Sequence, residues 1–126
     1  MPIIHNIIIS IFFILLLVQA IESPAIEVID DAGRKIFLEQ PAQKIISLSP
    51  HITELIFSAG AGEKLSGVDD YSNYPKAAKS ITRIGDANHL DIETILSLQP
   101  DLIVAWGSGQ SHNRYIQQLI RLQQTV

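Results

Sequence analysis

Near the middle of the chain, a short apolar run gives way to apolar residues at helical spacing. Residues 45–48 have the length and the β-branched character of a buried strand. Ser49 then stands before Pro50, which predicts a helix start, because a serine hydroxyl accepts from free backbone N–H groups and proline is tolerated at the first helical position. Gly60 and Gly62 are predicted to end the helix. Its predicted apolar face consists of Ile52, Leu55, Ile56 and Ala59.

A hairpin is predicted before this strand. Residues 26–30 and 35–38 read as two strands that flank a turn at residues 31–34, where Gly33 can adopt a positive φ. We expect the hairpin to cover one edge of the sheet.

Polar and apolar segments alternate again after the helix. A short strand is predicted at residues 64–68, followed by a polar, aromatic loop at residues 69–75 and a helical turn at residues 75–79. The pattern of residues 81–85 is ambiguous. The order of strands and helices predicts an α/β fold, in which a parallel sheet carries helices on both faces.

The next predicted helix begins at Asp91 as its cap and ends before Pro100. Its expected apolar face is formed by Ile92, Ile95 and Leu96. Residues 101–106 form a strongly apolar segment of the kind found in strands that are buried on both faces. Helical spacing of apolar residues returns over residues 111–122.

The amino terminus resembles a secretion signal. Residues 7–18 are apolar apart from Ser10, and the small-residue pattern that ends at Ala20 suits cleavage by a signal peptidase. The run is shorter than the roughly 20 residues that span a bilayer, although a retained anchor is the alternative. We therefore expect a signal peptide at residues 1–20, a leader with the hairpin at residues 21–43, and one domain from residue 44 to residue 126.

Composition excludes several function classes. The formal charge of −4 argues against a nucleic-acid partner, which usually requires a basic surface. The chain has no cysteine, so disulfides, cysteine-ligated metals and thiol nucleophiles are excluded. Neither glycine-rich piece completes a dinucleotide-binding motif, and no GxSxG nucleophile elbow is present. Asp86, His89 and Asp91 are close enough in sequence to suggest a metal site, but helix capping and loop solvation explain them more simply.

Unusual residues follow three of the predicted strands. The first strand ends in Ser49, Pro50 and His51, the second in the loop that carries Tyr71 and Tyr74, and the third in Trp106. Carboxyl ends of parallel strands gather at one edge of a sheet, where ligands bind. An aromatic rim there suits a large, flat organic ligand and predicts binding without catalytic groups. The tyrosines alternatively lie over the neighbouring helix.

Three segments together resemble the amino-terminal, Rossmann-like lobe of periplasmic substrate-binding proteins for iron complexes and cobalamin. They are SLSPHITELIFSAGAG, DYSNYP and LQPDLIVAWGSG. The similarity is greatest to members that bind cobalamin (vitamin B12). It implies a corrinoid held between two lobes in the periplasm, an inner-membrane ABC transporter permease as partner, and no enzymatic activity or cofactor.

The resemblance also implies residue roles. Tyr71 and Trp106 match aromatic residues that contact the corrinoid, and Ser49, Pro50 and His51 match the turn that lines the cleft floor. Glu93 matches a glutamate that docks onto arginines of the permease, although a carboxylate in a first helical turn is favoured by the helix dipole anyway. A further pocket tryptophan of the cobalamin proteins is replaced by Ala87, which keeps haem or a ferric siderophore open as the ligand.

Members of this family continue through a connecting helix and a second lobe, which this sequence lacks. The sequence thus resembles a fragment or a truncated product, and we expect weak or absent corrinoid binding by the chain alone. A metal-dependent enzyme that uses His51, His89 and nearby carboxylates is the remaining alternative.

Overall fold

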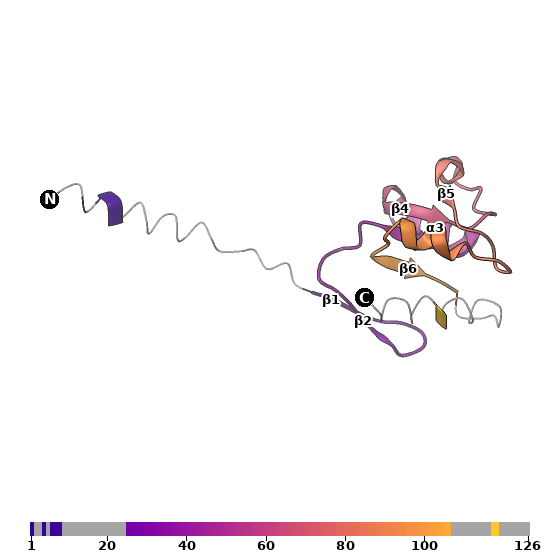
Figure 1. Cartoon of the computed structure of the whole chain (residues 1–126), viewed down its shortest axis with the longest axis horizontal. Coiled ribbons are helices and arrows are strands. Elements are labelled where there is room, and N and C mark those ends of the chain that lie inside the picture. The colour runs from indigo at the N-terminus through magenta and orange to yellow at the C-terminus, as the bar shows by residue number, and fades with distance from the viewer. Residues whose placement is uncertain (2–3, 5, 9–24, 107–116, 119–126) are drawn as a thin grey trace.

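A parallel sheet of four strands forms the centre of the molecule (Figure 1). The computed structural model describes residues 25–106, together with residues 1, 4, 6–8, 117 and 118. The strand order is β5 (Thr82–Arg83), β4 (Leu65–Val68), β3 (Ile45–Ser47) and β6 (Leu102–Val104), and each neighbouring pair is parallel. The predicted parallel α/β fold is thus confirmed.

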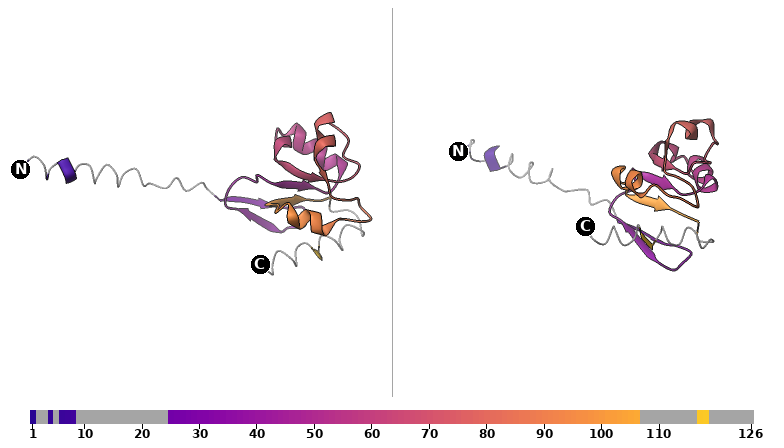
Figure 2. Two further views of the ribbon diagram at one scale, coloured as in Figure 1. Left: turned by 45° about the horizontal axis from the view of Figure 1, so that its top comes forward. Right: turned by 45° about the vertical axis from the view of Figure 1, so that its right-hand side comes forward.

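Helices lie on both faces of this sheet. α2 (Pro50–Ser58) follows β3, and α3 (Ile92–Ser97) follows β5 and leads into β6. Two short 3₁₀ helices, η1 (Gly62–Lys64) and η2 (Lys76–Ser80), precede β4 and β5. In the left view of Figure 2, α3 lies on one side of the sheet and the magenta helical segments lie on the other.

Side chains of β3 alternate between these two faces, as a strand requires. Ile46 and Leu48 join a buried cluster with Ile84, Leu90 and Ile95 on the α3 side. Ile45 joins Leu65 and Val68, against which Ile56 and Phe57 of α2 pack. The strand is therefore buried on both faces, as its sequence predicts.

Local signals placed the helix ends correctly. The Ser49 hydroxyl accepts from the backbone N–H of Ile52, and Pro50 is the first residue of α2. Gly60 ends the helix with a φ of 79°. Gly62 has another role: a Cβ there would lie 2.2 Å from the Phe57 ring, so glycine permits close packing. Asp91 caps α3 by accepting from the backbone N–H of Thr94.

The predicted apolar faces of the two helices were partly wrong. In α2, Leu55 is 53% exposed and Ala59 is exposed, whereas Thr53 is fully buried. Thr53 faces inward because its hydroxyl has hydrogen-bond partners there. In α3, Leu96 is 46% exposed, and Leu98, beyond the helix, packs on the core instead.

The last described strand is also less buried than its sequence predicts. All three residues of β6 are half-buried rather than buried on both faces. Within the described residues β6 lies at the edge of the sheet, so it has a strand neighbour on one side only. The helix predicted over residues 111–122 lies outside the described residues, apart from residues 117 and 118, which are helical.

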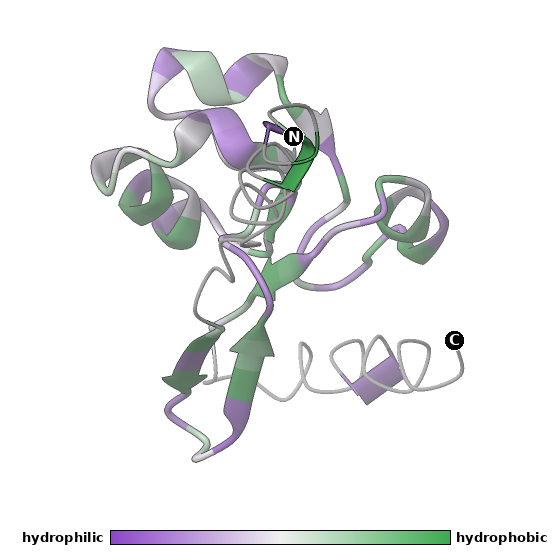
Figure 3. Cartoon of the chain, turned by 90° about the vertical axis from the view of Figure 1, so that its left-hand side faces the viewer, coloured by the Kyte–Doolittle hydropathy of each residue, from purple (hydrophilic) through white to green (hydrophobic). Residues whose placement is uncertain are grey.

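The predicted hairpin is present but does not join the central sheet. β1 (Ile26–Ile29) and β2 (Lys35–Leu38) pair antiparallel in a sheet of their own, and Gly33 has the expected positive φ of 75°. Both figures place the hairpin on the β6 side of the domain. It therefore does not extend the sheet edge by hydrogen bonding. Apolar residues lie along both of its strands (Figure 3), and Phe37 is 63% exposed.

Candidate functional site

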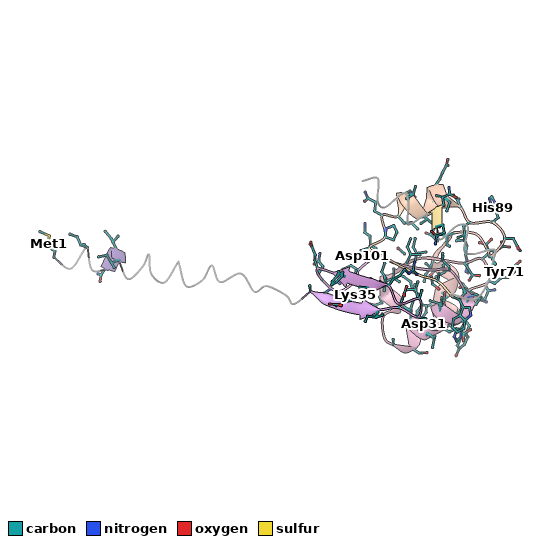
Figure 4. All side chains as sticks on the ribbon, turned by 90° about the horizontal axis from the view of Figure 1, so that it is seen from below. Met1, Asp31, Lys35, Tyr71, His89 and Asp101 are labelled. Carbon is teal, nitrogen blue, oxygen red and sulfur yellow. The ribbon has the colours of Figure 1, made fainter. Side chains whose placement is uncertain are left out.

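The carboxyl ends of three parallel strands place the predicted site residues at one edge of the sheet. β3 leads into the Ser49–His51 turn, β4 leads into the loop with Tyr71, and β6 leads to Trp106. Figure 4 shows Tyr71 at the end of the domain remote from Asp101, which precedes β6. The opposite end of the sheet is tied by the Asp101 carboxylate, which accepts from the backbone N–H groups of Gln43 and Lys44 at 2.7 and 2.9 Å.

His51 and Trp106 form a direct aromatic contact at this edge. Their ring centroids are 5.4 Å apart and their planes are inclined by 82°, an edge-to-face arrangement. The contact follows from the sheet register, because β3 and β6 are neighbours with Ser47 opposite Val104. Trp106 is nevertheless 54% exposed, so part of its surface remains accessible to another partner.

The tyrosines lie on the other side of β3. Tyr71 is 66% exposed and Tyr74 is 70% exposed, and the peptide bond between Tyr74 and Pro75 is cis. Because β3 separates β4 from β6, the starts of the two aromatic segments are two strand spacings apart, on the order of 10 Å. Both rings are therefore accessible to a partner, and the alternative in which they lie over the neighbouring helix stays open.

Ser49 and Pro50 support the turn and are only half-buried. The Ser49 hydroxyl caps α2, and the backbone carbonyl oxygen of Ser49 accepts hydrogen bonds from the hydroxyls of Ser47 and Thr53. Among the residues of this turn, His51 is the one whose side chain is exposed.

A buried polar network, which the sequence did not reveal, lies beneath the site. It is formed by four buried side chains, Ser47, Thr53, Asp69 and Ser72. Thr53 Oγ1 lies 2.9 Å from Ser47 Oγ and 2.8 Å from Ser72 Oγ, and the Ser72 hydroxyl donates to the Asp69 carboxylate. Burial raises the pKa of the Asp69 carboxyl, and the hydrogen bond from Ser72 opposes this shift. The available signal was Ser47, a hydroxyl within an apolar strand.

Glu93 is exposed in the first turn of α3. The cap of this helix is the neighbouring Asp91, whose two carboxylate oxygens accept from the Thr94 N–H and hydroxyl at 2.9 and 2.7 Å. These hydrogen bonds lower the pKa of Asp91. The capping role is thus filled by Asp91 and not by Glu93.

The carboxylates of the suggested metal site bind backbone groups instead. Asp86 Oδ1 accepts from the N–H groups of Asn88 and His89 at 2.8 and 3.0 Å, and Asp91 caps α3. Over the described part of the chain, no group of three or more His, Cys, Asp or Glu side chains could hold a metal ion.

In the same residues, no helix has the length and apolar character needed to cross a membrane. Most of the predicted signal peptide lies outside the described residues, which include only residues 1, 4 and 6–8 of it.

Comparison with known proteins identifies several that are similar to this chain in sequence and in structure. A vitamin B12-binding protein of Vibrio campbellii is 47% identical over 73 residues, which are 58% of this chain and 26% of the relative. The crystal structure of the periplasmic vitamin B12-binding protein of Vibrio cholerae matches with 44% identity and a TM-score of 0.56, over 63% of this chain and 32% of that one. A periplasmic haem-binding protein of Pseudomonas aeruginosa matches with 28% identity and a TM-score of 0.50, over 58% of this chain and 27% of that one.

The chain therefore spans about a quarter of the length of the curated relatives that it matches. Residues 45–121 match the family described as periplasmic binding protein. This segment covers more than half of the sequence and includes the sheet, both helices and the aromatic residues at the strand ends. The chain belongs to the periplasmic binding protein family.

Proposed function

We propose that this chain supplies the amino-terminal lobe of a receptor that binds cobalamin or another corrinoid and delivers it to an ABC transporter permease. In this proposal Tyr71, His51 and Trp106 contact the ligand, while Ser49 and Pro50 shape the turn that carries His51. The role is binding without catalysis, and the corrinoid is cargo rather than a resident cofactor.

The observation that carries the proposal is the His51–Trp106 pair at the same sheet edge as the exposed Tyr71. Exposed aromatic rings offer flat apolar surfaces with polar edges, which suit a broad macrocycle with polar substituents. Each ring that is already held by the fold binds at a smaller entropic cost than one that must be ordered on binding.

The nature of the relatives favours a corrinoid over haem. The vitamin B12-binding proteins match at 44–49% identity in the examples from Vibrio campbellii and Vibrio cholerae, compared with 28% for the haem-binding protein of Pseudomonas aeruginosa. Haem remains the second candidate because Ala87 replaces a further pocket tryptophan of the cobalamin proteins. Ala87 is half-buried and cannot supply the stacking surface of that tryptophan.

Delivery of the ligand requires export and docking. We propose that residues 1–20 direct the chain to the periplasm, and that Glu93 forms part of the surface that meets basic residues of the permease. The exposure of Glu93 supports this role, because its carboxylate is accessible to a partner.

The single tryptophan provides the test, because its fluorescence reports on Trp106 alone. The purified chain without residues 1–20 is titrated with cyanocobalamin and, separately, with haem. Free tryptophan amide at the same concentration corrects for light absorbed by each ligand. We expect saturable quenching by cyanocobalamin, with weak affinity because one lobe covers only part of the ligand.

Two variants make the titration specific to the site. Tyr71→Ala should weaken the response to cyanocobalamin, whereas Phe37→Ala, which removes an equally exposed ring on the hairpin, should leave it unchanged. Tighter binding of haem than of cyanocobalamin would replace the corrinoid by haem in the proposal. Because the chain alone is expected to bind weakly or not at all, absence of quenching by either ligand is followed by calorimetric titration of a complete two-lobe receptor that contains this lobe. Absence of binding of either ligand to that receptor would refute the proposal.

A further inference from the structure

The buried hydroxyl network connects the two segments that are proposed to contact the ligand. Thr53 belongs to α2, two residues after His51, and Ser72 directly follows Tyr71. Their hydroxyl oxygens are 2.8 Å apart, and both residues have no exposed surface. One buried hydrogen bond thus joins the helix that begins with the His51 turn to the loop that carries Tyr71.

The hydroxyl groups of this network each have one proton to donate, which assigns a direction to its hydrogen bonds. Ser47 donates to the Ser49 carbonyl oxygen, and Ser72 donates to the Asp69 carboxylate. Thr53 then has one proton and three acceptors within reach, which are the oxygens of Ser47, Ser49 and Ser72. Removal of the Thr53 hydroxyl would leave the bonds donated by Ser47 and Ser72 in place but would remove the buried hydrogen bond between Thr53 and Ser72, and the loss of a buried hydrogen bond is unfavourable.

The loop is held on its other side by the β5 segment. Arg83 Nη1 donates to the carbonyl oxygens of Asp69 and Ser72 at 2.8 and 2.9 Å, and the Asp70 N–H donates to the Gly85 carbonyl oxygen at 2.9 Å. These bonds fix the loop against β5 but not against α2. Within residues 25–106, the hydrogen bond that joins the loop to α2 is the one between Ser72 and Thr53.

We propose that Thr53 and Ser72 are positioning residues that set the separation between Tyr71 and the His51–Trp106 pair and thereby the affinity for the ligand. The inference rests on the proposed corrinoid-binding function. Neither hydroxyl touches the ligand, because both are buried beneath the aromatic surface. Their contribution is preorganisation: without the junction, β5 still holds the loop, but the position of Tyr71 relative to α2 must be fixed when the ligand binds.

The experiment compares Thr53→Val, which removes the hydroxyl at nearly constant volume, with Thr53→Ser, which keeps it. Both are titrated with cyanocobalamin by Trp106 fluorescence in the chain without residues 1–20. We expect Thr53→Val to weaken binding about tenfold and Thr53→Ser to change it by less than about twofold, as for the loss of one buried hydrogen bond.

A double-mutant cycle with Tyr71→Ala separates positioning from general stability. If Thr53 acts through Tyr71, Thr53→Val has no further effect on affinity once the tyrosine ring is gone. A lower melting temperature with unchanged affinity, or fully additive losses in the cycle, would overturn the proposal. Ser72→Ala, which adds no volume, takes the place of Thr53→Val if that variant does not melt cooperatively.

Amide hydrogen exchange without ligand distinguishes failure of this inference from failure of the proposed function. Thr53→Val should accelerate exchange of the Ser72 N–H, which donates to the Asp69 carbonyl oxygen, but not of the Ile95 N–H in α3. If a complete two-lobe receptor that contains this lobe binds no corrinoid while the Ser72 exchange responds, the proposed function fails but the junction remains. Unchanged Ser72 exchange would refute the junction itself.

Discussion

The imidazole of His51 meets the indole of Trp106 edge-to-face, with ring centroids 5.4 Å apart. His51 belongs to the first turn of α2, whereas Trp106 follows β6, so the contact joins two segments that are distant in sequence. Contacts of this kind contribute about 0.5–1.5 kcal/mol beyond burial. The pair fixes the orientation of an exposed tryptophan at the edge where the β4 loop presents Tyr71.

In a complete two-lobe receptor, replacement of Trp106 by alanine should weaken corrinoid binding by about 1–3 kcal/mol while leaving the fold nearly intact. The indole is 54% exposed, so its loss creates no core cavity. Calorimetric titration measures the affinity, because the fluorescence of Trp106 is lost in this variant, and thermal melting measures stability. Phe37→Ala is the control, with a ring that is 63% exposed on the hairpin. A large decrease in melting temperature with unchanged affinity would mean that Trp106 is a structural residue.

Glu93→Gln should slow docking onto the permease and spare ligand binding. A charge at the rim of an interface mainly alters the association rate and its dependence on salt. Association of the complete receptor with the membrane-embedded permease is measured at low and high salt. Glu54→Gln is the matched control, because Glu54 is an exposed glutamate on α2. Equal docking rates of Glu93→Gln and the unmodified receptor at low salt would exclude the role.

Ionisation of Asp69 should make the folded state less stable as the pH rises. Because burial raises its pKa, the folded state binds more protons than the unfolded state just above the ordinary aspartate pKa of about 3.9. The free energy of unfolding contributed by this group therefore falls as the pH rises from that value through the raised pKa, and is constant above it. Asp69→Asn, measured by denaturant unfolding across this range, should remove the dependence.

Asp91→Asn provides a control of opposite sign. Hydrogen bonds from Thr94 lower the pKa of Asp91, so its stabilisation is present above the unfolded pKa and is lost as the pH falls through the lowered one. Asparagine remains a good helix cap, so the fold should persist. If the difference between the original chain and Asp69→Asn were independent of pH, or rose with pH, the buried environment assigned to Asp69 would be wrong.

Export should be followed by cleavage after Ala20. The apolar run at residues 7–18 and the small residue at position 20 motivate this prediction. Amino-terminal sequencing of the secreted product should begin at Ile21, and Ala20→Phe should prevent cleavage. Recovery of the intact apolar segment in a membrane-bound form of the unmodified chain would instead support the retained anchor.

The sequence by itself determined the features that depend on a few adjacent residues. Ser49 and Pro50 predicted the start of α2, Gly60 its end, and Asp91 the cap of α3. The alternation of apolar segments predicted a parallel sheet with helices on both faces. The helix ends could be predicted because capping and backbone preferences act within one or two turns of chain. The sheet could be predicted because alternating strands and helices with right-handed crossovers allow few other arrangements.

Only the tertiary structure decided which surfaces are buried and which polar groups meet. Thr53 turns inward because Ser47 and Ser72 supply hydrogen-bond partners from β3 and the β4 loop, and no local pattern in α2 encodes those partners. The half-buried state of β6 depends on its place in the strand order, and the contact between His51 and Trp106 depends on the pairing of β3 with β6. Burial and long-range contacts are set by neighbours in space, whereas sequence periodicity reports only on neighbours along the chain.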